Sequence, residues 1–352
     1  MYTTPSPPAG CLREDNVSYN NRIASVPVPA CRLCGSRGDM LYERLTDLTY
    51  AAPGEWNLRR CRNTDCGLVW LDPTPSEEEI HKAYRVYYTH PGYIEGEKRI
   101  DWWNYLFLKG CKPLQKLFLR VSGIRRFEKE WRSRADDLFL DGPPPGGKLL
   151  DVGCGKGDFL VRMSRKGWKV EGTEVDSGAV EQASVKNGLT VHTGTLEDAG
   201  FPTDSFDAVT MNHVIEHVHD PVSVLQACLR LLKPSGRLVA ITPNLDGVGH
   251  ERFGRNWRGL EPPRHLHLFT RRTLKECAAQ AGFRSIETWC LPGYADAILQ
   301  SSMDIEERAT GKKRGEFSRW VEVSLLKVRE YSRYNHKNDV GEEVVLMARK
   351  DS

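Results

Sequence analysis

No run of apolar residues approaches the roughly 18 that a membrane-spanning helix requires. The first residues lack the basic-then-apolar pattern of a secretory signal peptide, so a cytoplasmic location is the default expectation. An excess of one charge is also missing, because 50 Lys+Arg stand against 47 Asp+Glu and leave a net charge of +3. So small an excess argues against a polyanion-binding surface and hence against a nucleic-acid partner. The sequence shows no internal repeat and does not indicate an oligomeric state.

The 10 cysteines do not form the evenly spaced pattern of a disulfide framework. Four cluster early, as Cys31-x-x-Cys34 and Cys61-x4-Cys66, and a glycine follows the second cysteine of each pair. Structural zinc takes four thiolates from two tight backbone turns, and glycine permits such turns. The spacing therefore predicts a structural zinc site with no open position on the metal. Four unpaired thiols are the alternative.

Breaker-rich stretches and a change of pattern divide the chain. Pro, Ser, Thr and Asn dominate the start, and "DGPPPGG" at 141–147 marks a later boundary. Beyond it, strand-like and helix-like segments alternate, which is typical of an α/β fold with a parallel sheet covered on both faces. We predict a flexible tail at 1–28, a zinc ribbon at 29–75, a helical linker or cap at 76–145, and an α/β domain at 146–352 with a helical insertion at about 292–340.

The segment "LLDVGCGKGDFL", residues 149–160, places three glycines between a buried strand and the start of a helix. Without Cβ atoms, Gly153, Gly155 and Gly157 let the backbone turn sharply and approach a ligand. The next strand ends in Glu174, 23 residues after Asp151 (174 − 151), where a carboxylate can accept the hydroxyl protons of a ribose. A tight turn without a ligand is the alternative for the glycines alone.

This G-x-G-x-G loop, preceded by an acidic residue in the strand, resembles the motif of class I S-adenosylmethionine-dependent methyltransferases. The resemblance covers roughly residues 146–290. It implies a Rossmann-like methyltransferase sheet with helices on both faces, to which the ribbon and helical additions are attached. Methyltransferases with an N-terminal zinc ribbon are similar to this chain over 31–75 as well.

The resemblance also implies S-adenosyl-L-methionine as cofactor and assigns residues to it. The backbone of Gly153, Cys154 and Gly155 would border the methionine moiety, and Glu174 would hold the ribose. Asn212, at the end of the fourth strand, would border the sulfonium. The adenine would lie against Thr195, Leu196 and Glu197.

Histidines follow the fourth strand in "HVIEHVHDP", residues 213–221. Alone, His213-x-x-Glu216-His217 has the spacing of a zinc hydrolase motif on a helix. In similar methyltransferases this segment faces the reactive methyl group, so His213 or His217 would act as a general base, with His213 favoured as the closer to the strand. Ubiquinone-pathway O-methyltransferases have E-x-x-E-H here, associated with a divalent metal, and His213 replaces the first Glu. A purely structural role for Glu216 and His217 is the alternative.

A second cluster, "WRGLEPPRHLHLF", covers residues 257–269. His265 and Phe269 match a P-x-H-x-x-x-F element of similar methyltransferases, where it would form one wall of the acceptor pocket. Trp257, Arg258 and Arg264 would then hold an aromatic or anionic acceptor. The alternative is an ordered loop that ends in a helix cap at Thr270.

These patterns together predict a methyltransferase that acts on a small-molecule acceptor, with oxygen as the favoured acceptor atom. The alternatives are a zinc-ribbon RNA methyltransferase and a non-catalytic protein that keeps the cofactor-binding fold. The near-neutral charge argues against the first, and the intact glycines and Glu174 argue against the second. A zinc hydrolase would need a third ligand, which no interpretable spacing supplies.

Overall fold

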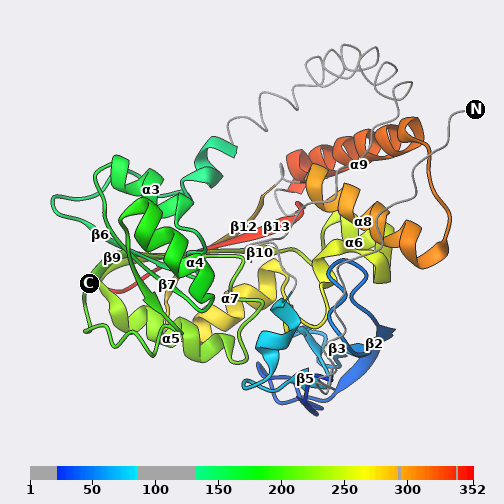
Figure 1. The fold of residues 1–352 in the computed structure, drawn as a ribbon, viewed down its shortest axis with the longest axis horizontal. Coiled ribbons are helices and arrows are strands. Elements are labelled where there is room, and N and C mark those ends of the chain that lie inside the picture. The colour runs from blue at the N-terminus through cyan, green and yellow to red at the C-terminus, as the bar shows by residue number, and fades with distance from the viewer. Residues whose placement is uncertain (1–21, 86–131, 292–294, 338–339) are drawn as a thin grey trace, which may run out of the picture.

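The computed structural model describes residues 22–85, 132–291, 295–337 and 340–352. Its centre is a seven-stranded sheet of order β12-β13-β10-β9-β6-β7-β8 (Figure 1). The neighbours from β10 to β8 pair in parallel, whereas β13 is antiparallel to both β10 and β12. The strands are β6 (Lys148–Val152), β7 (Lys169–Glu174), β8 (Thr190–Thr193), β9 (Phe206–Asn212), β10 (Leu232–Pro243), β12 (Ser285–Leu291) and β13 (Glu343–Arg349). The predicted α/β fold is confirmed.

Helices cover both faces of this sheet, as the strand–helix alternation predicted (Figure 1). They are α3 (Asp158–Arg165), α4 (Ser177–Glu181) with a π-helical turn at Gln182–Lys186, α5 (Pro221–Leu231) and α7 (Arg271–Gln280). The Asp220 side chain accepts a hydrogen bond from Ser223 N and starts α5, and Thr270 forms a capping box with Thr273 at α7. Both caps hold the loops that follow β9 and β10 in fixed positions.

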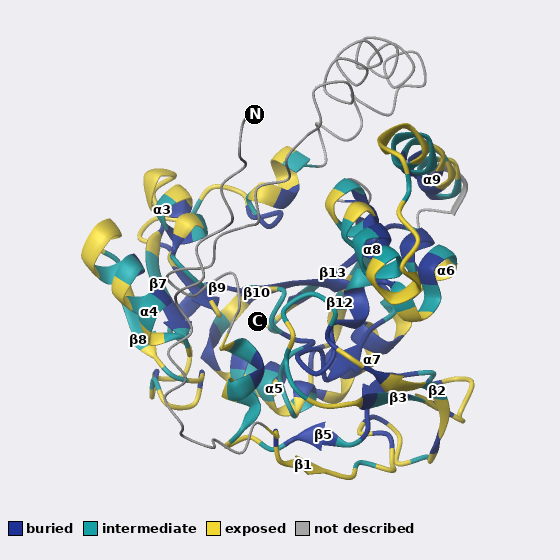
Figure 2. Cartoon of the chain, turned by 45° about the vertical axis from the view of Figure 1, so that its right-hand side comes forward, coloured by how far each residue is buried: buried dark blue, intermediate teal, exposed yellow. Residues whose placement is uncertain are grey.

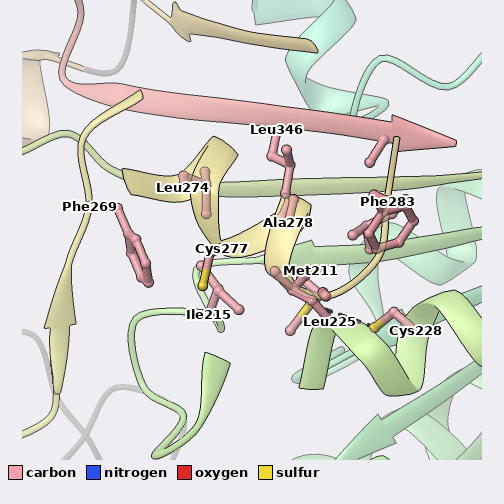
Figure 3. Packing of buried hydrophobic residues seen from close by; sticks show 14 of the residues in the cluster. Met211, Ile215, Leu225, Cys228, Phe269, Leu274, Cys277, Ala278, Phe283 and Leu346 are labelled. Atoms are coloured by element: carbon pink, nitrogen blue, oxygen red, sulfur yellow. Dashed lines mark hydrogen bonds between the residues drawn. The ribbon is translucent and has the colours of Figure 1, made fainter. Parts of the chain in front are cut away.

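Alternating residues of the strands supply the two cores. In β6, Leu149 faces a core shared with Met163 of α3, while Leu150 faces the core shared with α5 and α7. Figure 3 shows the second core, where Leu225 and Cys228 of α5 lie near Met211. Figure 2 shows the central strands β9, β10 and β13 mostly buried and the outer faces of the helices exposed. The sheet is thus a rigid base for the loops at its carboxyl edge.

The N-terminal ribbon is part of the same folded unit. Its strands β2 (Gly38–Leu45), β3 (Trp56–Cys61) and β4 (Val69–Leu71) are extended by β11 (His267–Leu268), which gives the order β11-β4-β3-β2. β1 (Ser25–Val26) pairs with β5 (Thr74–Pro75), so residues 22–28, which the sequence assigned to the tail, lie against the ribbon. Residues 1–21 are outside the described part. Long-range pairing with β5 explains why composition alone misplaced this boundary.

The remaining helices connect these parts. α6 (Val248–Phe253) and the 3-10 turns η3 (Gly254–Asn256) and η4 (Arg258–Leu260) follow β10. α8 (Ala295–Thr310) and α9 (Glu316–Lys337) occupy the predicted insertion, and residues 292–294 and 338–339 are not described. Of the predicted helical linker at 76–145, the structure describes η1 (Ile80–Tyr84) and a short helical stretch at 132–136, whereas residues 86–131 are not described. Among the described residues, every helix is too short or too polar to span a membrane.

Candidate active site and cysteine cluster

The glycine loop connects β6 to α3 at the carboxyl edge of the sheet. Gly153, Gly155 and Gly157 have φ angles of 69°, 53° and 80°, in the left-handed region that favours glycine. A Cβ atom on Gly153 would lie 2.6 Å from Val214 Cγ2, so this position also lacks room for a side chain. The loop therefore exposes backbone groups where parallel-sheet proteins bind ligands.

Glu174 ends the neighbouring strand and lies beside this loop. Gly155 N–H donates to its Oε2 and Asp176 N–H donates to its Oε1, each at 2.9 Å. These two bonds fix the carboxylate, and each oxygen keeps a lone pair for a further donor. The predicted ribose acceptor is thus positioned by the loop that would contact the methionine moiety.

Asp151 and Cys154 lie beneath the loop and not at its surface. Thr210 Oγ1 donates to Asp151 Oδ1 at 2.7 Å, and burial raises the pKa of Asp151 to about 7. A Cβ atom on Gly172 would lie 2.6 Å from Cys154 Sγ, and burial also raises the pKa of this thiol. Asp151 therefore ties β6 to β9, and Cys154 packs as a small loop residue.

The predicted adenine side follows β8. Gly194 N–H donates to Glu174 O at 2.9 Å, which brings this loop next to the ribose position. Asp198, which the sequence analysis did not select, accepts bonds from Thr195 N and Thr195 Oγ1 at 2.8 and 2.7 Å. Leu196 is buried and Glu197 is exposed. Val175, also missed, is 70% exposed and offers apolar surface directly after Glu174.

His213 follows β9 directly after the exposed Asn212. Its Nδ1 lies 3.3 Å from Glu216 Oε1 and its Nε2 lies 3.0 Å from Glu343 Oε1. Burial disfavours the imidazolium, but hydrogen bonds to these carboxylates and their charges outweigh burial and raise the pKa of His213 to about 10. At pH 7 this side chain is a cation with both nitrogens engaged. It is therefore unsuited to the role of base for which the sequence favoured it.

The His213 ion pair predicts a specific dependence of stability on pH. Its pKa rises on folding from 6.5 to about 10, so the stabilisation is complete below about pH 6.5 and is lost as pH rises toward 10. Urea unfolding of wild type and His213→Gln should differ most near pH 6 and converge near pH 10. His250→Gln is the control, because burial lowers the pKa of His250. A wild-type advantage that stays constant from pH 7 to 10 would contradict the ion pair.

Residues 213–217 form turns and not a helix, with His217 N–H bonded to Val214 O at 2.9 Å. The i, i+4 geometry of a zinc hydrolase is therefore missing. In addition, both ring nitrogens of His213 are engaged by carboxylates, Nδ1 by Glu216 and Nε2 by Glu343, so neither is available to a metal ion. The hydrolase interpretation of this motif is wrong.

His217 and His265 meet edge to face, with ring centroids 4.7 Å apart. His217 Nδ1 lies 3.0 Å from Arg264 O and 2.9 Å from Tyr84 Oη, and His265 Nδ1 lies 2.7 Å from Gly259 O. A carbonyl oxygen only accepts, so each Nδ1 has the hydrogen; in the neutral tautomer that this defines, the lone pair lies on Nε2. Burial lowers the pKa of His265 to about 4, so this ring is neutral at pH 7.

Glu216 completes this cluster from beneath. Thr242 Oγ1 donates to its Oε2 at 2.9 Å. Burial opposes ionisation, but the hydrogen bond from the His213 imidazolium and its charge outweigh burial and lower the pKa of Glu216 to about 2. One ligand atom each of Glu216, His217 and His265 lie within 4.8 Å of one another, so these residues could hold a divalent cation. The sequence grouped Glu216 with His217 but not the two with His265.

The second predicted cluster divides between the core and a cavity. Arg264 is fully buried, where it pairs with Asp47 at 2.7 Å and Glu261 at 2.9 Å, so it cannot hold an acceptor as predicted. Phe269 is also fully buried and packs with α7 in Figure 3. Trp257 is 1% exposed and its Nε1–H donates to Glu342 Oε2 at 3.3 Å, so its ring cannot hold an acceptor as predicted either. Arg258, by contrast, is half-buried and lines a cavity beside the ribbon.

The four ribbon cysteines converge as their spacing predicted, with all Sγ atoms within 4.8 Å. The Cys31–Cys66 and Cys34–Cys61 sulfur distances are 3.6 and 3.3 Å. Tetrahedral zinc with Zn–S bonds of about 2.3 Å needs sulfurs about 3.8 Å apart. Gly35 and Gly67 have φ angles of 71° and 72°, as the two tight turns require. The residues present therefore fit a four-coordinate zinc ion.

Comparisons with known proteins find a methyltransferase domain in the part of the chain that contains the glycine loop. A family model described as a methyltransferase domain matches residues 124–288. The ubiquinone biosynthesis O-methyltransferase of Haemophilus ducreyi is 38% identical over 123 residues, which cover 32% of this chain and 50% of that protein. The Vibrio vulnificus enzyme of that name is 37% identical over 151 residues, 41% of this chain and 57% of its own. The chain thus spans about half the length of the curated relatives it matches.

Among solved structures, the chain is similar to phosphoethanolamine N-methyltransferase 2 of Haemonchus contortus in complex with S-adenosyl-L-methionine. The sequence identity is 20% and the TM-score is 0.43, and the match covers 64% of this chain and 53% of that one. A methyltransferase from Archaeoglobus fulgidus has 18% identity, a TM-score of 0.42 and coverage of 71% and 100%. The family match thus assigns residues 124–288 to a methyltransferase domain, and the sheet order is that of the Rossmann-like α/β fold that the sequence predicted.

Proposed function

We propose that this protein transfers a methyl group from S-adenosylmethionine to a hydroxyl group of a small molecule. The observation that supports this most is the Glu174 carboxylate, fixed beside the glycine loop at the carboxyl edge of a methyltransferase sheet. The curated relatives named above are O-methyltransferases, which favours oxygen as the acceptor atom. Cytoplasmic location and a small-molecule partner are part of the same proposal.

The cofactor would lie across the carboxyl ends of β6, β7 and β9. Glu174 would accept the ribose hydroxyls, while the backbone at Gly153, Cys154 and Gly155 would border the methionine moiety. The adenine would lie near Leu196 and the exposed Val175. Asn212, exposed at the end of β9, would border the sulfonium. When bound, this cofactor supplies an activated methyl group, so the protein mainly has to align the acceptor.

His217 is the base that the geometry favours. It is half-buried, whereas His265 is 4% exposed and His213 is ion-paired. Its Nδ1–H is held by the Arg264 carbonyl, so Nε2 can take the hydroxyl proton as the oxygen attacks. Glu216 and His265 would stabilise the imidazolium that results.

Replacing His217 with alanine should lower turnover by about 100-fold or more, the usual range for loss of a general base. Affinity for S-adenosylhomocysteine should stay within about twofold, because His217 is not among the residues we assign to cofactor binding. His219→Ala is the matched control, since His219 lies in the same loop but bonds to Pro75 O at 2.8 Å. Equal turnover of His217→Ala and wild type would exclude His217 as the base.

We also propose that the four ribbon cysteines bind one structural zinc ion. Burial raises the pKa of the Cys66 thiol to about 11, and a cation is the natural means of stabilising its thiolate. With four protein ligands, such an ion has no position for substrate. Its role would be to hold the two turns of the ribbon together.

The activity is tested by incubating the protein with methyl-labelled S-adenosylmethionine and three acceptor sets: catechols and phenolic acids, small amines, and bulk tRNA. We expect label to appear in the hydroxyl compounds. Transfer to tRNA alone would favour the RNA methyltransferase alternative. Cofactor binding without transfer to any set would favour a non-catalytic protein.

A further inference from the structure

A cavity of about 540 Å³ opens between the ribbon and the helical insertion, away from the glycine loop. Three segments line it: residues 44–49 at the end of β2, residues 255–262 around η3 and η4, and residues 305–310 at the end of α8. In Figure 1 these elements meet where the ribbon lies beside α6 and α8. None of the residues assigned to the cofactor lines this cavity.

Arginines dominate the charge of the lining. Arg44, Arg255, Arg258 and Arg308 stand against two acidic residues, Asp47 and Glu261. Both carboxylates are already engaged, because Arg264 donates to each of them. Asp47 also accepts from the N–H groups of Thr49, Tyr50 and Ala52, and Glu261 pairs with Arg258. The cavity therefore has an excess of positive charge.

Arg255 and Arg308 account for this excess at the rim. Arg255 Nη2 donates to Glu43 O at 3.1 Å, and Arg308 Nη1 donates to Leu48 O. Among the described residues, no carboxylate lies within ion-pair distance of either guanidinium. A guanidinium has five N–H donors in a planar fork, so each side chain is oriented by a carbonyl and keeps donors for a ligand.

The cavity is too large for a bare anion and falls in the range of small-molecule sites, about 300–1,000 Å³. Leu45, Leu48 and Ile305 provide apolar surface within it. Glu261 connects the cavity to the histidine cluster, since its Oε2 lies 3.6 Å from His265 Nε2. A molecule bound in the cavity would thus lie close to His265.

We propose that this cavity binds a small molecule with a carboxylate or phosphate group, which Arg255 and Arg308 hold at the rim while its apolar part lies against the leucines. Carboxylate and phosphate groups both present oxygens that match the planar donors of a guanidinium, so the lining selects for an oxyanion of either kind. The inference concerns a site distinct from the cofactor edge and does not require catalysis.

Calorimetry at fixed ionic strength tests the site with three probes: pyrophosphate, benzoate, and benzamide as the neutral analogue of benzoate. We expect wild type to bind pyrophosphate or benzoate and to bind benzamide more weakly. The double variant Arg255→Gln/Arg308→Gln should bind the anion about tenfold or more weakly. Arg62→Gln/Arg284→Gln removes the same charge from exposed arginines outside the cavity and should bind as wild type does.

Failure of wild type to bind either anion, or equal binding by the two double variants, would overturn the proposal. S-adenosylhomocysteine is titrated into the same samples. Cofactor binding without anion binding would reject this site and leave the proposed function intact, whereas anion binding without cofactor binding would do the reverse. Unchanged cofactor affinity in the Arg255→Gln/Arg308→Gln variant also shows that it is folded.

Discussion

Replacing Glu174 with alanine is expected to weaken S-adenosylhomocysteine binding by about 100-fold or more, because two hydrogen bonds to a carboxylate contribute about 1.5–3 kcal/mol each. The substitution also removes the acceptor for Gly155 N–H, so the glycine loop loses its contact with β7. Calorimetry measures the affinity, and thermal unfolding verifies that the variant is folded.

Glu171→Ala is the matched control for this change. Glu171 lies on the same strand and its Oε2 is 3.5 Å from His192 Nε2, but it does not contact the glycine loop. Its removal should leave the cofactor affinity unchanged. If Glu174→Ala binds as tightly as wild type, or if both variants lose the same affinity, Glu174 is not the ribose acceptor.

Replacing Cys66 with serine is expected to abolish binding of about one zinc ion per chain and to lower the melting temperature of the whole unit by about 10 °C or more. The effect should extend beyond the ribbon because Cys66, Leu68 and Trp70 share a buried core with Leu274 and Cys277. Metal quantification and calorimetric melting measure the two effects.

Cys228→Ala is the control, since Cys228 is a fully buried thiol outside the cluster. It should cost some stability but retain the zinc. A Cys66→Ser protein that keeps its full zinc content would show that the metal, if any, is bound elsewhere. A single transition for wild type, shifted as a whole in Cys66→Ser, would support the shared core.

Local patterns predicted the features that depend on neighbouring residues. The alternation of strand-like and helix-like segments predicted the central sheet, because apolar residues that face a core recur with the period of a strand or of a helix. The positions of the glycine loop and of Glu174 were predictable because few residue types suit them: the turn needs glycine, and a contact to hydroxyl groups needs a carboxylate. The convergence of the two cysteine pairs was predictable for the same reason, because a glycine follows each pair where a tight turn needs one.

Features that depend on long-range contacts escaped prediction. The pairing of β11 with β4 joins residues about two hundred positions apart and makes the ribbon part of the main unit. The pKa of His213 is raised by the neighbouring Glu216, but also by Glu343, which lies 130 residues away in the sequence. Likewise, Arg264 is not available for a ligand because it pairs with Asp47, 217 residues away in the sequence. Motif spacing contains no information on such partners.

The most direct test of the central proposal is calorimetric titration of the wild-type protein with S-adenosylhomocysteine. The glycine loop and Glu174 predict binding of about one molecule per chain, because ligands of such folds bind at the carboxyl edge of the sheet, beside this loop. No measurable binding to the folded wild-type protein would contradict the account.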